Sequence, residues 1–78
     1  MIISQYLEPF DEGGRPIPYD EAFRIIRAEM GLTREELAQR IGVSFRRIEG
    51  IEQARWKPGL MTLQWVFKEY AKFKEGKS

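Results

Sequence analysis

Two short amphipathic patterns in the middle of the chain leave little choice about its fold. The first opens at Thr33, whose hydroxyl can cap a helix, and Glu36 follows at the spacing of a capping box. It closes at Gly42 after about two turns, and Ser44 can cap a second pattern that runs to about Gln53. A glycine stop followed so soon by a new cap predicts two short helices that meet at a tight corner.

The size and composition of the chain allow one domain with a small core. Its 78 residues include no cysteine and no histidine, so neither a disulfide nor a zinc site is expected. The sequence has no phosphate-binding loop and no recognisable catalytic constellation, which argues against an enzyme, a cofactor or a metal. It has no signal peptide and no apolar run of membrane-spanning length. We therefore expect a cytoplasmic protein that makes no membrane contact.

Charges are divided along the chain, although the net charge is only +1. Residues 1–23 hold five acids and one base, whereas residues 24–78 hold twelve bases and seven acids. Such a division lets one side of a nearly neutral protein bind phosphates. Ordinary scatter of charges is the alternative.

Helical periodicity continues on both sides of the corner. A helix is expected from about Asp20, taken as its N-cap, to Met30, with Gly31 as its stop. A longer helix should start at Pro58-Gly59 and run to about Lys74. The apolar positions expected to share one face of each helix, in chain order, are Phe23, Ile26, Met30, Leu37, Ala38, Ile41, Ile48, Ile51, Leu60, Leu63, Val66, Phe67, Tyr70 and Phe73.

The residues before this helical unit form an arm. Residues 1–7 fit one short strand, whereas the prolines and glycines of residues 8–18 argue against regular structure. A lone strand cannot satisfy its own backbone, so it must pair with a second copy, dock on its own domain or stay disordered. We favour pairing of residues 2–7 with the same strand of a second copy. The fold class is all-α: an extended arm (1–19), a compact four-helix domain (20–75) and a short tail (76–78).

Two charges lie on helix faces that are otherwise apolar. Arg27 shares the inward face of the first helix, and Glu52 shares the inward face of the third. We predict that they form an ion pair, because a buried charge needs a partner. The alternative is that both side chains reach the rim of the core.

The helix expected at residues 44–53 carries basic groups on the side that its core positions leave free. Its outward and flanking positions are Phe45, Arg46, Arg47, Glu49, Gly50 and Gln53. Such a helix can lie in the major groove of DNA, where Arg46 can donate two hydrogen bonds to guanine and Phe45 can contact a thymine methyl. Glu49 either accepts from cytosine or is a solvated charge. Gly50 either permits close approach to DNA or is simply tolerated.

Polar groups around this surface are expected to contact phosphates, which supply affinity and position rather than sequence reading. The candidates are Arg34, Ser44, Arg47, Gln53, Arg55 and Lys57. For Arg55 and Lys57, an ordinary surface charge is the alternative.

These motifs resemble those of the Cro/phage-repressor type (XRE-like) helix-turn-helix proteins. The matching residues are Thr33 to Ser44, Ile48-x-x-Ile51-Glu52 and Lys57-Pro58-x-Leu60-x-Thr62-Leu63, and the resemblance covers about residues 21–70. It implies a lambda-repressor-like domain of bacterial, phage or plasmid origin that binds operator DNA as a dimer. It also implies base contacts at Phe45, Arg46 and Gly50, a first-turn DNA contact at Arg34, and a buried pair of Arg27 with Glu52.

The chain departs from the family pattern at four points. Arg34 stands where glutamine is usual, Phe45 where polar residues are frequent, and Ala54 where a loop glycine is usual. The sequence also leaves no room for the fifth helix that commonly forms the dimer contact. These departures fall on the positions that contact DNA in the family and on its usual dimer contact.

We interpret the chain as a sequence-specific regulator of transcription, most simply a repressor that binds a palindromic double-stranded operator as a homodimer. One module reads few base pairs, and two-fold pairing doubles the site. The expected dimer interface consists of apolar residues that the core does not need, namely Ile2, Ile3, Tyr6, Leu7, Trp65 and Phe73. The alternative is a partner-binding module, such as an antitoxin that binds a toxin or another regulatory protein, with the acidic arm or the aromatic face as its contact.

Overall fold

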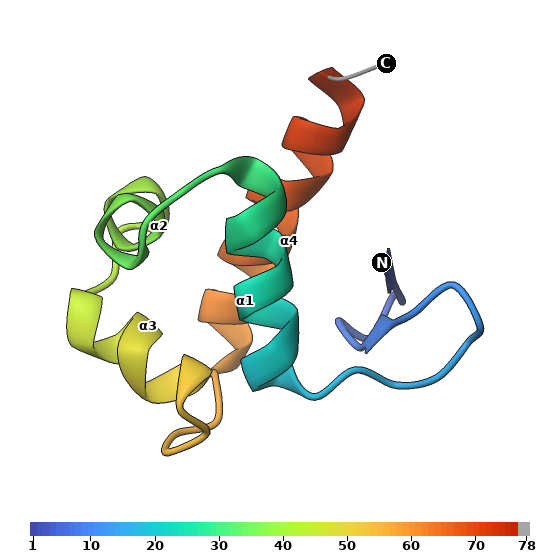
Figure 1. Cartoon of the computed structure of the whole chain (residues 1–78), viewed down its shortest axis with the longest axis horizontal. Coiled ribbons are helices and arrows are strands. Elements are labelled where there is room, and N and C mark those ends of the chain that lie inside the picture. The colour runs from blue at the N-terminus through green and yellow to red at the C-terminus, as the bar shows by residue number, and fades with distance from the viewer. Residues whose placement is uncertain (77–78) are drawn as a thin grey trace.

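The structure is a computed structural model that describes residues 1–76. In this part of the chain two short strands precede four helices: β1 (Ile2–Ile3), β2 (Pro9–Phe10), α1 (Tyr19–Met30), α2 (Arg34–Ile41), α3 (Phe45–Glu52) and α4 (Leu60–Gly76). Figure 1 shows this arrangement, which confirms the expected four-helix, mainly helical fold. The last helix continues past Lys74 to Gly76, and residues 77–78 of the expected tail lie outside the described residues.

The corner between α2 and α3 forms because each helix begins with its own cap. The Thr33 hydroxyl accepts a hydrogen bond from the Glu36 backbone N–H (3.1 Å), and the Glu36 carboxylate accepts one from the Thr33 N–H (2.8 Å). The Ser44 hydroxyl accepts from the Arg47 N–H (3.2 Å). Gly42 ends α2 at a φ of 76°, a left-handed conformation that suits glycine. The predicted capping box, glycine stop and second cap are all confirmed.

The start of α1 differs from the prediction. Pro18 occupies the cap position without a side-chain hydrogen bond, and the helix begins at Tyr19 rather than after an Asp20 cap. Asp20 lies in the first turn, where a carboxylate interacts favourably with the helix dipole, and it pairs with Arg24 one turn later (3.3 Å). Proline suits this boundary because its N–H is not needed there.

The core is built from one stripe of each helix. Its buried members are Phe23 and Ile26 from α1, Leu37, Ala38 and Ile41 from α2, Ile48 and Ile51 from α3, and Leu63, Val66, Phe67 and Tyr70 from α4. The predicted stripes are therefore correct, with three exceptions. Leu60 is exposed, because it is the first residue of α4, and Met30 and Phe73 are only partly buried.

The arm folds back on its own chain. β1 pairs with β2 in an antiparallel hairpin, with Ile2 opposite Phe10 and Ile3 opposite Pro9. Pro9 cannot donate a ladder hydrogen bond, but its carbonyl accepts one from the Ile17 N–H (2.9 Å). The prediction that residues 8–18 contain no regular structure is thus wrong at Pro9–Phe10. Residues 2–3 therefore pair within their own chain, which is the docked alternative for the arm, and pairing of residues 2–7 with a second copy stays a prediction.

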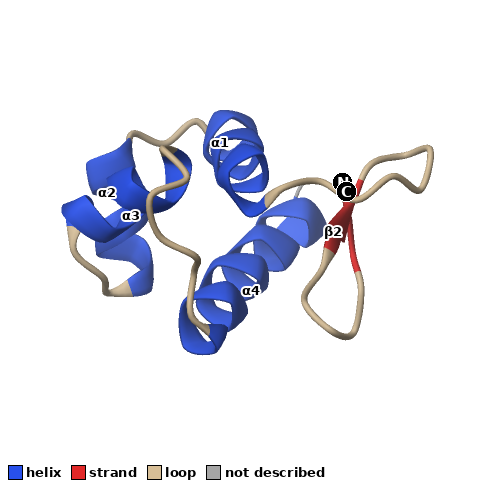
Figure 2. Ribbon diagram, turned by 90° about the horizontal axis from the view of Figure 1, so that it is seen from below, coloured by secondary structure: helices blue, strands red, loops and turns tan. Residues whose placement is uncertain are grey.

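Apolar contacts and one hydrogen bond attach this hairpin to the helices. Met1, Ile3 and Leu7 pack against the core. The Tyr19 hydroxyl donates to the Leu7 carbonyl (3.1 Å). In Figures 1 and 2 the hairpin lies on one side of the α1–α4 pair, whereas α2 and α3 lie on the other. The arm therefore does not cover α3.

A polar cluster joins α1 to α4 across the middle layer. The Tyr70 hydroxyl donates to both carboxylate oxygens of Glu29 (3.1 and 3.0 Å), and the Lys74 ammonium contacts the same carboxylate at 3.1 Å.

No helix in the described part of the chain is both long and apolar enough to cross a bilayer.

Candidate nucleic-acid interface

The central feature of the site is the exposed side of α3. Ile48, Ile51 and Glu52 are buried, as predicted, and this fixes the rotation of the helix. Arg46 and Arg47 are consequently exposed in its first turn. Both lie beside the Ser44 cap, at the end of the helix where backbone N–H groups point outward.

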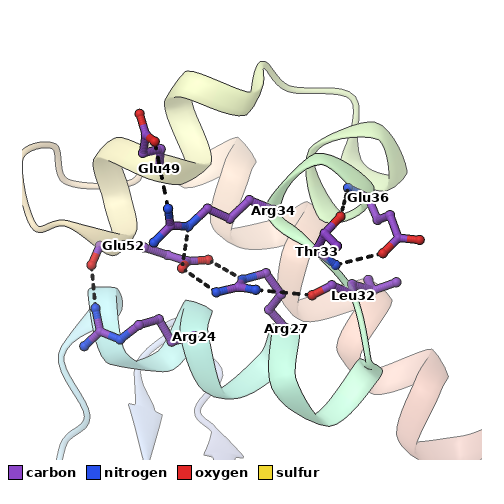
Figure 3. Close-up of polar contacts among 8 residues, drawn as sticks. All are labelled: Arg24, Arg27, Leu32, Thr33, Arg34, Glu36, Glu49 and Glu52. Carbon is purple, nitrogen blue, oxygen red and sulfur yellow. Dashed lines mark hydrogen bonds and ion pairs between the residues drawn. The ribbon is translucent and has the colours of Figure 1, made fainter.

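The rotation of α3 is locked by a buried ion pair, as Figure 3 shows. Glu52 accepts hydrogen bonds from Arg27 Nε (2.9 Å) and Arg27 Nη2 (3.0 Å), which confirms the predicted pair. The Glu52 side chain is fully buried, and that of Arg27 is 26% exposed. The hydrogen bonds to Glu52 raise the pKa of Arg27 above its ordinary value, against the opposing effect of burial. Arg27 also donates to the Leu32 carbonyl (3.3 Å), so it links the α1–α2 loop to α3.

Two further arginines contact Glu52, and the sequence prediction missed both contacts. Arg34 Nε donates to the Glu52 carboxylate (3.2 Å), and Arg34 Nη1 lies 3.9 Å from Glu49. Arg24 donates to the backbone carbonyl of Glu52. Arg34 was expected to contact phosphate, but its guanidinium is engaged by carboxylates on α3. We call Arg24, Arg27, Arg34, Glu49 and Glu52 the Glu52 cluster.

Gly50 does not lie on an open surface, which corrects the expectation that it faces outward. It is buried, and a Cβ placed there would lie 2.3 Å from Cε3 of Trp56. The indole ring of Trp56 therefore occupies the space that a side chain at this position would fill. The loop after α3 holds the ring there, because the Arg55 N–H donates to the Gly50 carbonyl (2.9 Å).

Several cations around α3 have no carboxylate partner within residues 1–76. They are Arg46, Arg47, Arg55 and Lys57, and all four are exposed. Of the other residues expected to contact DNA, Phe45 is half-buried, whereas Ser44 and Gln53 are exposed. Gln53 occupies the C-cap position of α3, where its backbone N–H donates to the Glu49 carbonyl. The exposed end of α3 and the loop after it thus carry positive charge that the fold leaves uncompensated. Within the same residues, no group of three or more acidic side chains could hold a metal ion.

The residues expected at a dimer interface divide into two groups. Ile2, Tyr6 and Trp65 are exposed. Ile3 and Leu7 are partly buried against the core of their own chain, and Phe73 is also partly buried. Ile2 and Tyr6 belong to the hairpin, whereas Trp65 lines a hollow with Arg40 and Ile41 of α2.

Comparison with known proteins agrees with this geometry. A helix-turn-helix family model matches residues 23–64, which is more than half of the chain. The chain belongs to the helix-turn-helix family. The matched region runs from α1 into α4 and contains the whole of α2 and α3, so the resemblance to the Cro/phage-repressor (XRE) type is confirmed.

One relative of this helix-turn-helix protein is an uncharacterized HTH-type transcriptional regulator from Methanothermobacter thermautotrophicus (strain Delta H). The two are 49% identical over 35 residues, which is 45% of this chain and 51% of the relative. The chain therefore spans about half the length of this relative. No solved structure matches the chain.

Proposed function

We propose that this helix-turn-helix protein is a sequence-specific regulator of transcription that binds double-stranded DNA, most simply a repressor that acts as a homodimer on a palindromic operator. The observation that carries the proposal is the pair of exposed arginines, Arg46 and Arg47, in the first turn of a rigidly held helix, neither of which has a carboxylate partner among residues 1–76. The name of the partial relative, an HTH-type transcriptional regulator, points the same way.

In this proposal α3 enters the major groove with its N-terminal end. Arg46 donates two hydrogen bonds to O6 and N7 of a guanine, a contact worth about 1–3 kcal/mol of discrimination against other bases. Phe45 lies against a thymine methyl group. Arg47, Arg55 and Lys57 contact phosphates, with the N-capping Ser44 beside them, and set affinity and register.

The proposed role of Arg34 follows from the Glu52 cluster. Its Nε is hydrogen-bonded to the buried Glu52 carboxylate, and its Nη1 lies near Glu49 (3.9 Å). We assign Arg34 to positioning rather than to phosphate binding, because it joins the start of α2 to the end of α3. A fixed angle between the two helices lets Arg46 reach a base edge without prior rearrangement, which lowers the entropic cost of binding.

The proposed dimer uses the exposed start of α4. Leu60, Met61 and Trp65 are large apolar residues that remain exposed there. Met61 and Trp65 are four residues apart and so lie on one side of the helix. Exposed apolar residues grouped in this way are suited to association with a second copy, and a two-fold axis is the commonest symmetry of such homodimers.

The test starts with selection of binding sites from a library of random duplexes. The wild-type protein should enrich a sequence with two-fold symmetry, and Arg46→Ala should bind it more weakly and lose selection at one guanine in each half-site. Arg15→Ala is the matched control, because Arg15 is exposed in the arm and lies far from α3 in the chain. Failure to enrich any sequence, or an equal loss of affinity for all sequences in Arg46→Ala, would contradict sequence-specific reading by this residue.

A partner-binding module, such as an antitoxin, is the second candidate function. The observation in its favour is an apolar groove of about 610 Å³ between the hairpin and α4, lined in part by Met1, Ile3, Leu7 and Phe67. The acidic arm lies beside it. If this function is the main one, Arg46→Ala should leave binding of the protein partner intact while DNA binding is lost.

A further inference from the structure

Trp56 is an exposed aromatic residue beside the recognition surface. It is 53% exposed, although it is among the largest apolar side chains in the protein. Arg55 and Lys57 flank it in the loop between α3 and α4, and both are exposed and unpaired within residues 1–76. Within the same residues, the indole N–H has no hydrogen-bond acceptor. A tryptophan recruited only to fill the core would bury more of its surface.

The position of the ring is fixed by α3 itself. A Cβ on Gly50 would lie 2.3, 2.7 and 2.8 Å from Cε3, Cζ3 and Cδ2 of Trp56, so the benzene half of the indole is seated directly on the helix backbone. The N–H groups of Arg55 and Trp56 both donate to the Gly50 carbonyl (2.9 and 3.4 Å), and Ala54 takes a left-handed φ of 60° that turns the loop back. Glycine at this position is required, because any side chain there would displace the ring.

The Trp56 ring lies on the same side of α3 as Arg46, because it is seated at Gly50. Arg46 and Gly50 are four residues apart, so they lie one above the other on the same side of the helix. Trp56 therefore stands where the next outward side chain after Arg46 would be. The loop thus supplies a side chain at the position where α3 itself has none.

We propose that Trp56 is a DNA-contacting residue that extends the reading surface of α3 by one helical turn. This inference rests on the proposed DNA-binding function. The exposed edge of the indole would lie against deoxyribose or a thymine methyl at the side of the groove, and its N–H would donate to a phosphate oxygen. The flanking Arg55 and Lys57 would hold the backbone of the same strand near the ring.

Fluorescence provides the direct test, because the chain has only two tryptophans. In a Trp65→Phe variant Trp56 is the sole emitter. Because Trp65 lies in the proposed dimer surface, the variant is first required to match the oligomeric state and the duplex affinity of the wild type. Titration with the duplex selected above should then change the emission intensity and wavelength of Trp56. The midpoint should coincide with the binding curve measured independently by anisotropy of dye-labelled duplex. Binding seen by anisotropy without any change in Trp56 emission would overturn the inference and leave the proposed function intact. Absence of duplex binding by the wild-type protein in the anisotropy assay would overturn both.

Duplex affinities of matched variants distinguish a direct contact of Trp56 with DNA from a role of Trp56 in packing the loop. Trp56→Ala should weaken binding about tenfold, toward the lower end of the range for aromatic side chains that stack on single-stranded bases, while its thermal unfolding midpoint stays near that of wild type. Gly50→Ala should cause a similar loss by displacing the ring, and should cause little further loss in the Trp56→Ala background, since the two changes then act through one contact. Wild-type affinity in Trp56→Ala, or a loss that matches a fall in its thermal midpoint, would contradict a direct contact.

Discussion

Replacing Arg27 with methionine should destabilise this protein more than any other single change to a charged residue near α3. Methionine keeps much of the unbranched stem but removes the guanidinium that donates to both oxygens of Glu52 at 2.9 and 3.0 Å. The Glu52 side chain is fully buried. The variant would therefore hold a carboxylate in the core with one remaining hydrogen bond, from Arg34 (3.2 Å).

The expected loss of unfolding free energy follows from the hydrogen bonds that Glu52 keeps and loses in this variant. Breaking a buried ion pair by removing one partner costs roughly 3–5 kcal/mol, because the other charge stays buried without compensation. Arg34 compensates in part, so we expect the lower end, about 3 kcal/mol. For a domain of this size 1 kcal/mol lowers the unfolding midpoint by about 4–8 °C, which gives a fall of about 12–24 °C.

Urea unfolding followed by far-ultraviolet circular dichroism measures this loss. Arg24→Met is the matched control, since Arg24 is on the same helix but its ion pair with Asp20 is at the surface and its contact with Glu52 is to the backbone. It should cost about 1 kcal/mol. Changing Arg27 and Glu52 together to apolar residues should recover much of the stability. If Arg27→Met is no less stable than Arg24→Met, the pair does not hold α3 in place.

Three further predictions concern the N-cap of α2, the stability of the protein in acid and the proposed phosphate contacts. Thr33→Ala should cost about 1 kcal/mol, because it removes one half of the capping box; an unchanged urea midpoint would contradict this. Burial raises the pKa of Glu29, but hydrogen bonds from Lys74 and Tyr70 outweigh it and hold the pKa below its ordinary value of 4.5. As the pH falls, the Glu29 carboxylate is therefore protonated in the unfolded chain before it is protonated in the folded one. The stability that the ionised Glu29 contributes is present above its ordinary pKa and is lost as the pH falls through its lower, folded pKa. Glu29→Gln should be less stable than wild type at neutral pH, and the gap should close in acid; parallel pH curves of unfolding free energy would refute the assignment. Arg47→Ala should reduce the slope of log affinity against log salt by about one unit, and an identical slope would remove this residue from the phosphate contacts.

The parts of the site that sequence could predict are those that depend on neighbours within one helical turn. The hydroxyls of Thr33 and Ser44 cap the helices that they precede, and Gly42 ends α2, because these interactions need no knowledge of the rest of the fold. The Arg27–Glu52 pair spans a larger distance along the chain. It was predictable because only these two charges fell on inward helix faces.

The contacts that sequence could not predict depend on how segments meet in space. Arg34 reaches Glu52 only because the corner brings the start of α2 beside the end of α3. Trp56 returns to Gly50 because Ala54 adopts a left-handed conformation, for which an alanine gives no signal. The hairpin was missed because Pro9 reads as a strand breaker, although its position opposite Ile3 needs no N–H from it.

The most direct measurement is a titration of the nitrogen-labelled protein with the selected duplex, followed by proton–nitrogen correlation spectra of the backbone amides. The largest shift changes should fall on residues 44–50, around Arg46 and Arg47, with smaller ones at the start of α2 and in the loop before α4. The hairpin of residues 2–10, on the opposite side of the molecule, should change little. Shift changes confined to the hairpin and the C-terminal half of α4, with α3 unaffected, would contradict DNA binding through α3.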